Sequence, residues 1–245
     1  MRTLEGIARM CLSGLVLATV CVWVQGPAEA QPPPRDVGLV TALSGEVIYW
    51  SQAEAQGRAE PFMKVRIGDR FEVGKDSSVQ IVFFQVSRQE LWRGPASFKV
   101  GETQGEALGG TTKGPEVTVL PSGTGQGIQR VPTLLRRAGL SRVGAMQVRG
   151  TPGARAEEAA PPGEAALSQE ERAEIEAARE TYKAMRQKAQ AGDLTPELFL
   201  LGILSEYEQY GEMEALLREA LSRHPGNDVL KDLAGWVQSQ RAKSR

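Results

Sequence analysis

The sequence predicts an α+β protein with two domains, an all-β N-terminal domain and an all-α C-terminal domain. From residue 37 to 149, short segments that alternate polar with apolar residues are separated by glycine turns, which is typical of an antiparallel β meander or sandwich. Residues 150–167 consist mainly of Gly, Pro, Ala and Glu, which predicts a disordered linker. From residue 168 to 241 apolar residues recur at the helical period, which predicts an array of helical hairpins.

The first thirty residues have the features of a secretory signal peptide. Arg2 and Arg9 precede an apolar run, and Ala28-Glu29-Ala30 is a small-x-small cleavage signal. The apolar run of about 14 residues is shorter than the roughly 20 that span a bilayer. We therefore expect cleavage after Ala30, a periplasmic or secreted protein, and no integral membrane span after cleavage. A retained leader that anchors the protein is the alternative. Residues 31–36 then form a Pro-rich spacer.

The β region is predicted from a period of two between turn signals. The strongest strand signal is at residues 78–84, where Val79, Ile81 and Phe83 share one face. A polar loop is expected at residues 51–60. The strands are expected at residues 37–40, 45–50, 64–67, 70–73, 78–84, 89–92 and 97–100.

A glycine-rich and arginine-containing extension completes the predicted β domain. Residues 116–120 predict one more strand, residues 133–140 a short helix that Gly139 ends, and residues 146–148 an edge strand. The glycine spacing of residues 122–127 is similar to that of a phosphate-binding loop. Because neither Lys-Ser/Thr nor a predicted helix start follows, we interpret these residues as a flexible loop.

Four helices are predicted after the linker. The first begins at the capping box Ser168-Gln169-Glu170-Glu171, and the second begins at Thr195-Pro196, where proline lacks only an unneeded donor. The third covers about residues 212–223, and Asn227 caps the fourth. The apolar stripes that face the helical core are expected to comprise Ile175, Ala178, Tyr182, Met185, Leu198, Leu201, Leu204, Met213, Leu216, Leu217, Ala220, Leu230, Leu233, Trp236 and Val237.

The supply of reactive side chains argues against an enzyme. Cys11 and Cys21 lie in the leader, and His224 is the one histidine. A single histidine cannot build a His-based metal cluster, and His224 is expected to cap a helix rather than to act in a Ser-His-Asp arrangement, so we expect no catalytic residue, no metal and no cofactor. His224 is expected at a helix C-terminus, where a basic side chain suits the helix dipole. Asp69 and Asp76 are expected in turns, where Asp bonds to the local backbone, rather than in a glycosidase-like carboxylate pair.

The two regions differ in charge. Residues 31–150 carry 15 Lys/Arg and 11 Asp/Glu, whereas residues 151–245 carry 12 and 17. Arginines gather in the extension, and guanidinium groups pair well with carboxylates and phosphates. Anionic lipid, a cell-wall polymer and the acidic helical domain are therefore candidate targets, and a solvated basic surface is the alternative. We expect no nucleic acid partner. The candidate anion-binding residues are Arg130, Arg136, Arg137, Arg142 and Arg149.

Aromatic side chains form two candidate contact groups. Trp50 and Trp92 are expected in the β core, with a carbohydrate-stacking surface as the alternative. Tyr207, Tyr210 and Trp236 pack between helices in one interpretation. In the other they line a peptide groove, and they are our candidate partner surface.

Glycine turns between short strands recur in Gly45-Glu46-Val47, in residues 67–74 and in residues 77–81. In these motifs, residues 37–100 resemble the FecR-type periplasmic domain. The resemblance implies an extracytoplasmic, β-rich module that occurs in iron-uptake signalling proteins and in many envelope proteins. Because the motif consists of turns and strands, it implies a fold rather than a site.

Leu201-Gly202, Ala220 and Pro225 fall close to the Leu-Gly, Ala and Pro positions of the tetratricopeptide repeat. In these residues the last helices resemble a degenerate repeat of that family. The resemblance implies a protein-binding surface, of which one repeat and its flanking helices supply a short groove.

Export, the two resemblances and the lack of catalytic groups predict a non-enzymatic envelope protein. We expect a periplasmic scaffold or adaptor that binds another envelope protein through its helical domain. A cell-wall or glycan-binding module, with peptidoglycan or an anionic surface as its partner, is one alternative. A membrane-tethered regulator of envelope signalling is the other.

Overall fold

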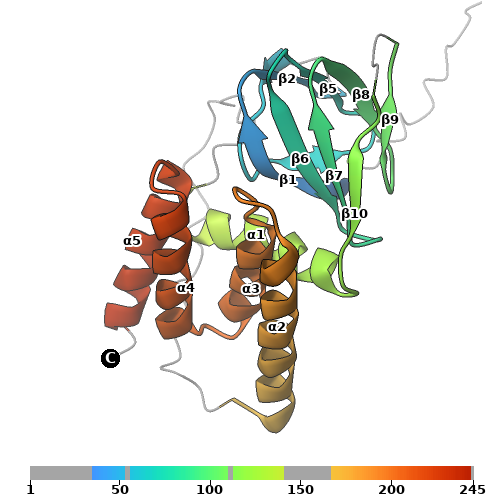
Figure 1. Ribbon diagram of the computed structural model, residues 1–245. Coiled ribbons are helices and arrows are strands. Elements are labelled where there is room, and N and C mark those ends of the chain that lie inside the picture. Colours follow the sequence, from blue (N-terminus) through green and yellow to red (C-terminus); the bar gives the residue numbers. More distant parts are fainter. Residues whose placement is uncertain (1–34, 53–55, 110–112, 141–166, 244–245) are drawn as a thin grey trace, which may run out of the picture. The chain divides into compact units, whose positions relative to one another are not determined.

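The computed structural model describes residues 35–52, 56–109, 113–140 and 167–243 (Figure 1). The predicted signal peptide, most of the predicted linker, the predicted strand at 146–148, and Arg142 and Arg149 lie outside the described residues. Among the helices of the described ranges, none combines the length and the hydropathy that a membrane crossing requires.

Within the described residues, ten strands form two five-stranded antiparallel sheets (Figure 1). Two antiparallel sheets followed by helices confirm the α+β prediction. Sheet A has the order β10 (Glu116–Val119), β7 (Arg88–Arg93), β6 (Ser78–Phe83), β1 (Asp36–Ser44) and β4 (Lys64–Arg66). Sheet B has the order β3 (Gln56–Arg58), β2 (Val47–Trp50), β5 (Arg70–Val73), β8 (Ala96–Val100) and β9 (Gly105–Ala107).

A core of buried side chains from both sheets holds the β part together. Val79, Ile81 and Phe83 all belong to this core, which confirms the face predicted for them. Trp92 of sheet A stacks on Phe98 of sheet B with ring centroids 4.2 Å apart. The burial of these aromatic rings contributes strongly to stability. Because the two sheets pack face to face over this shared core, the β part is a sandwich.

Two strands lie where the sequence predicts loops. β3 falls in the expected polar loop, and β9 falls in the glycine-rich extension. Every residue of β3 is exposed, so backbone pairing with β2 forms this strand without any apolar alternation. In β9 a Cβ on Gly105 would lie 2.8 Å from the Trp92 ring, so the glycine permits close approach to the core.

Five helices complete the described chain: α1 (Thr124–Arg137), α2 (Gln169–Lys188), α3 (Thr195–Glu206), α4 (Tyr210–Arg223) and α5 (Asp228–Lys243). The predicted capping box at Ser168 and Glu171 is confirmed, as is proline in the first turn of α3. The Asn227 side chain accepts a hydrogen bond from the Leu230 amide at 3.0 Å, which confirms the predicted cap of α5.

α1 corrects two predictions. It begins at Thr124 and ends at Arg137, so residues 124–127 are helical rather than a flexible loop, and the helix is not confined to residues 133–140. The glycines serve close packing. A Cβ on Gly125 would lie 2.0 Å from the Phe84 carbonyl oxygen, and one on Gly202 would lie 2.0 Å from the Gly127 carbonyl oxygen. Gly202 therefore allows the close approach of α3 to α1. This packing explains the glycine without reference to the tetratricopeptide repeat.

A second apolar core joins the helices to sheet A. It includes Leu39, Val82 and Phe84 of the β part together with residues of α1 to α5. α1 contacts β1 and β6 as well as α3, and α3 also contacts α2 and α4. Every residue of α3 except Glu206 is buried. α3 is therefore the central helix, and other parts of the chain cover it on all sides.

Candidate functional site

A pocket lies where sheet A meets the end of α2 and the loop to α3. Its volume is about 310 Å³. The apolar part of its lining includes Leu91, Leu120 and Met185. Its polar part includes Gln89, Thr118 and Asp193. A concave, mostly apolar site with a few polar groups is the usual form of a binding site.

A buried hydrogen-bond network forms one wall of this pocket. Gln80 Nε2 lies 2.7 Å from Asp193 Oδ1, 3.0 Å from Thr41 Oγ1 and 3.1 Å from Thr195 Oγ1. The Thr195 amide donates to Asp193 Oδ1 at 2.9 Å, and Gln89 Nε2 donates to Asp193 Oδ2 at 3.3 Å. Because all five residues are buried, the network fixes the position of the Asp193 carboxylate.

One acceptor of the network has no partner. Gln89 is 7% exposed, and no described residue donates a hydrogen bond to its Oε1. Leaving a buried acceptor unpaired costs about 1–3 kcal/mol. Reversing the amide would place an oxygen against the Asp193 carboxylate, so the orientation with Nε2 toward Asp193 is the favourable one. The pocket wall therefore offers a free acceptor next to a buried carboxylate.

The free edge of sheet A borders the same pocket. Leu120 donates its amide hydrogen to the Ser87 carbonyl, and Thr118 pairs with Gln89. Because hydrogen bonding alternates along an antiparallel ladder, the N–H and C=O groups of Val117 and Val119 point away from β7. β10 is the last strand of its sheet, so these groups are unpaired within the described chain.

Exposed apolar side chains gather at this edge. Among the described residues, the large hydrophobic side chains that remain exposed are Val86 (42%), Val117 (41%) and Val119 (82%). Val117 and Val119 lie on β10, and Val86 lies in the β6–β7 turn, next to Ser87. An edge strand with exposed β-branched residues is a template for another strand.

The structure places the predicted arginines at several locations. Arg130 of α1 pairs with Glu174 of α2 at 3.3 Å and with Glu206 of α3 at 2.6 Å. Arg137 Nη1 lies 3.5 Å from the Ser205 carbonyl, and Arg136 is exposed. Arg130 of the basic extension therefore pairs with acidic residues of the helical part of the same chain.

The predicted aromatic partner surface divides into two contacts. Tyr210 and Trp236 meet edge to face with ring centroids 5.9 Å apart, and all three side chains pack against the helical core. Tyr207 donates its hydroxyl hydrogen to Glu174 at 2.6 Å. This hydrogen bond, together with burial, raises the pKa of Tyr207 to about 12. These contacts are inter-helix packing, which was one of the two interpretations.

The two tryptophans of the β part differ in burial. Trp92 is 1% exposed, and its ring N–H donates to Glu90 at 3.1 Å, as expected for a core residue. Trp50 is half-buried at the end of β2 on sheet B, where Arg70 pairs with it in register. Trp50 also lines a shallow groove with Glu72 and Lys99.

The other singled-out polar residues have local roles. His224 occupies the C-cap of α4, as predicted, and burial lowers its pKa. Asp69 follows a turn and accepts hydrogen bonds from the Arg66 amide at 2.8 Å and the Tyr49 hydroxyl at 3.3 Å. Asp76 lies in the β5–β6 turn with φ 58°. Within the described ranges, no group of three or more His, Cys, Asp or Glu is arranged to hold a metal ion.

The sequence reasoning missed the network residues. Gln80 alternates with Val79 and Ile81, so period two places it on the outer face, which is commonly solvated. The available signal was that Val82 and Phe84 share this face with Gln80. An apolar outer face indicates a covered sheet, and a glutamine in it then indicates a buried polar contact.

Comparison with known proteins leaves the family open. No protein-family model matches this sequence, and no curated protein matches it. A solved structure described as "Cell surface anchoring domain" is similar at 19% sequence identity, covering 28% of this chain and 88% of that chain. Its TM-score is 0.26, and at this score the similarity supports no conclusion about fold or function.

Proposed function

We propose that this protein is an exported, non-enzymatic adaptor of the bacterial envelope. In this proposal it binds an extended segment of a partner polypeptide along the free edge of β10. The leader-like first thirty residues and the resemblance to FecR-type domains support the location. The observation that carries the binding mode is the exposed, unpaired edge with Val117 and Val119.

The other edges of the two sheets lack this combination. β3 consists of Gln-Gly-Arg, β9 of Gly-Glu-Ala, and β4 of Lys-Val-Arg with its valine buried. Charged side chains and short length protect an edge against pairing. β10 also begins with a charged residue, Glu116, but it alone among these edges carries two exposed valines and a threonine, so it is the edge at which an added strand gains most.

In this proposal the helical part supports the binding site, and the strand edge rather than a helical groove contacts the partner. A groove between tetratricopeptide-like helices needs an exposed inner surface, whereas α3 is buried under α1, α2 and α4. The predicted partner residues Tyr207, Tyr210 and Trp236 are engaged in packing. We therefore assign the helices to support of sheet A and the pocket, and the β10 edge to the partner.

Photocrosslinking in living cells tests this function. A photoreactive amino acid at Val119 should crosslink one defined polypeptide, and mass spectrometry should map the crosslink to an extended segment of it. The same group at Ala107, on the exposed edge of β9, is the matched control and should not crosslink that segment.

Val117→Pro gives a second control. Its N–H points away from β7, so proline removes an outer donor and leaves the ladder to β7 intact. The variant should fold with an unchanged melting temperature and lose the crosslink at Val119. Crosslinking that survives Val117→Pro, or that joins two copies of this chain, contradicts the proposal.

Glycan binding is a second candidate function, favoured by the position of Trp50. A half-buried tryptophan beside Arg70, Glu72 and Lys99 in a shallow groove offers a stacking face and hydrogen-bonding groups. Co-sedimentation with purified peptidoglycan tests it. Binding that Trp50→Ala abolishes and Val119→Ser leaves intact would support this function over strand pairing.

A further inference from the structure

The pocket and the β10 edge are neighbours in the register of sheet A. Thr118 pairs with Gln89, and Glu116 pairs with Leu91, and all four residues line the pocket. Side chains alternate between faces along a strand. In a segment paired to the outer edge of β10, every second side chain therefore lies on the face of the pocket.

The pocket wall contains two hydrogen-bond acceptors next to each other. Gln89 Oε1 is buried and has no partner among the described residues. Asp193 Oδ2 lies beside it and receives one long hydrogen bond, 3.3 Å from Gln89 Nε2. Two neighbouring acceptors fit a group that carries several N–H donors.

Charge at the pocket also favours a cation. The Asp193 carboxylate accepts hydrogen bonds from neutral groups. The donors are the side-chain amides of Gln80 and Gln89 and the backbone amide of Thr195. Arg186 reaches the Asp193 main-chain carbonyl, but its salt bridge is with Glu197. A buried carboxylate is stabilised by a cation at hydrogen-bonding distance.

Two further charged residues line the pocket. Glu116 accepts a hydrogen bond from Gln190 Nε2 at 3.1 Å, and Lys188 is exposed at the end of α2. Glu116 is also paired with Arg93 at 3.5 Å, so Asp193 is the lining carboxylate that has no salt bridge among the described residues. The apolar wall formed by Leu91, Leu120 and Met185 suits the methylene stem of a long basic side chain.

We propose that this pocket takes a lysine or arginine side chain of the bound segment, with its cationic head at Gln89 Oε1 and the Asp193 carboxylate. The inference rests on the proposed function, because the segment on β10 delivers the side chain. It specifies which segments the protein binds: extended segments that place a basic residue on the face of the pocket.

Small cations test the pocket without strand pairing. n-Butylguanidinium and n-butylammonium mimic the ends of the two side chains, and n-butanol is the neutral counterpart. In NMR titrations both cations should shift the side-chain amide signals of Gln89 in a saturable way, and n-butanol should not. No saturable shift with either cation overturns the inference.

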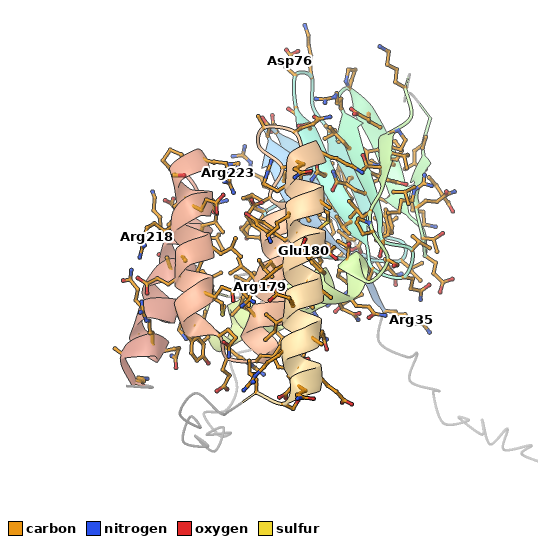
Figure 2. All side chains as sticks on the ribbon, turned by 60° about the horizontal axis from the view of Figure 1, so that its bottom comes forward. Arg35, Asp76, Arg179, Glu180, Arg218 and Arg223 are labelled. Carbon is orange, nitrogen blue, oxygen red and sulfur yellow. The ribbon has the colours of Figure 1, made fainter. Side chains whose placement is uncertain are left out.

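Variants then assign the binding to the two acceptors. Asp193→Asn should weaken cation binding about tenfold, since a hydrogen bond to a charged group contributes that much. Gln89→Met is the second variant and should weaken it as well; here the backbone amide signal of Thr195, which donates to Asp193, replaces the lost Gln89 side-chain signals. Asp76→Asn is the matched control, because Asp76 is exposed in the β5–β6 turn (Figure 2) and is not among the residues that line the pocket. Equal affinity in all three variants contradicts the assignment.

Peptide binding separates this inference from the proposed function. The probes are two labelled hexapeptides of alternating valine and threonine, one with a central lysine and one with norleucine in its place. Binding of the lysine peptide should be about tenfold tighter, and Val117→Pro should weaken both. Equal binding of both peptides that still depends on Val117 leaves the proposed function standing and refutes the basic side chain. Loss of Val117 dependence refutes strand pairing, while the small-cation result decides the pocket.

Discussion

Sheets A and B each have five strands in the described ranges, but they differ in what covers their outer faces. In β6 of sheet A five of six residues are buried, and Val82 belongs to the helical core while Val79 belongs to the sandwich core. In β5 of sheet B exposed and buried residues alternate strictly. The difference shows that helices cover the outer face of sheet A and leave the outer face of sheet B to solvent. A candidate site arises on sheet A because this cover stops at β10.

The largest expected change in stability comes from disrupting the close approach of α1 and α3, the helices that lie next to sheet A. Gly202→Val places side-chain atoms where the Gly127 carbonyl lies, so α1 and α3 must separate. We expect a loss of about 3 kcal/mol in the free energy of unfolding, as for severe overpacking. Urea denaturation followed by circular dichroism measures it.

Gly235→Ala is the control for that substitution. Gly235 lies in α5, and its Cβ position has no heavy atom within 4 Å. Alanine should stabilise the protein by up to about 1 kcal/mol, because alanine is the better helix former. Similar destabilisation by both substitutions would contradict the specific role of the α1–α3 approach.

The second prediction compares the outer faces of the two sheets directly. Val82→Ala should destabilise the protein by about 2 kcal/mol, because it removes buried methyl groups from the helical core. Glu72→Ala, on the outer face of sheet B, should change the unfolding free energy by less than about 0.5 kcal/mol. Equal effects in thermal or urea unfolding would show that the two faces are equally covered.

A smaller effect is expected at the start of α2. Ser168 accepts a hydrogen bond from the Glu171 amide, and the Glu171 side chain accepts one from the Ser168 amide. Ser168→Ala should cost about 1 kcal/mol of unfolding free energy. Ser222→Ala, on α4 and also exposed, is the control and should have a smaller effect. No difference between the two would argue against a helix start at Ser168.

The smallest expected effect is a pH dependence from the tyrosines. Burial, with the nearby Asp69, raises the pKa of Tyr49 to about 12, and the hydrogen bond to Glu174, with burial, raises that of Tyr207 to about 12. An unfolded tyrosine has a pKa of about 10, so the folded state holds its protons longer. Stability should therefore be fully present below pH 10 and fall as the pH rises from about 10 to 12.

Absorbance of phenolate near 295 nm checks this directly. Native protein should form phenolate from these two residues only as the pH approaches about 12. Tyr207→Phe should remove one late-titrating group and reduce the alkaline loss of stability. Phenolate formation by all tyrosines near pH 10 in the native protein would contradict the described environments.

The sequence predicted strands and helices wherever the apolar period was clear. Residues 78–84 and the capping box at Ser168 are examples, because their signals depend on neighbours in the chain. α1 could not be predicted in the same way. Gly125 and Gly127 read as loop residues in isolation, whereas contacts with Phe84 and Phe199 explain them.

The candidate site depends on contacts far apart in the chain. Gln80 and Asp193 are separated by 113 residues and meet where the start of α3 lies against sheet A, with Thr195 hydrogen-bonded to Gln80. β10 was predicted as a strand, but its place at the edge follows from the strand order of sheet A. The period indicated at most that Gln80 lies on a covered face; its partner Asp193 and the open edge at β10 could not be read from local patterns.

Hydrogen exchange of the β10 amides, without and with the partner segment identified by crosslinking at Val119, tests the central claim most directly. In the free protein the Val117 and Val119 amides should exchange rapidly, and the Thr118 amide, which pairs with β7, should be protected. At saturation with the segment, Val117 and Val119 should become protected as well. Protection of Val117 and Val119 in the free protein, or rapid exchange that persists at saturation, would contradict the account.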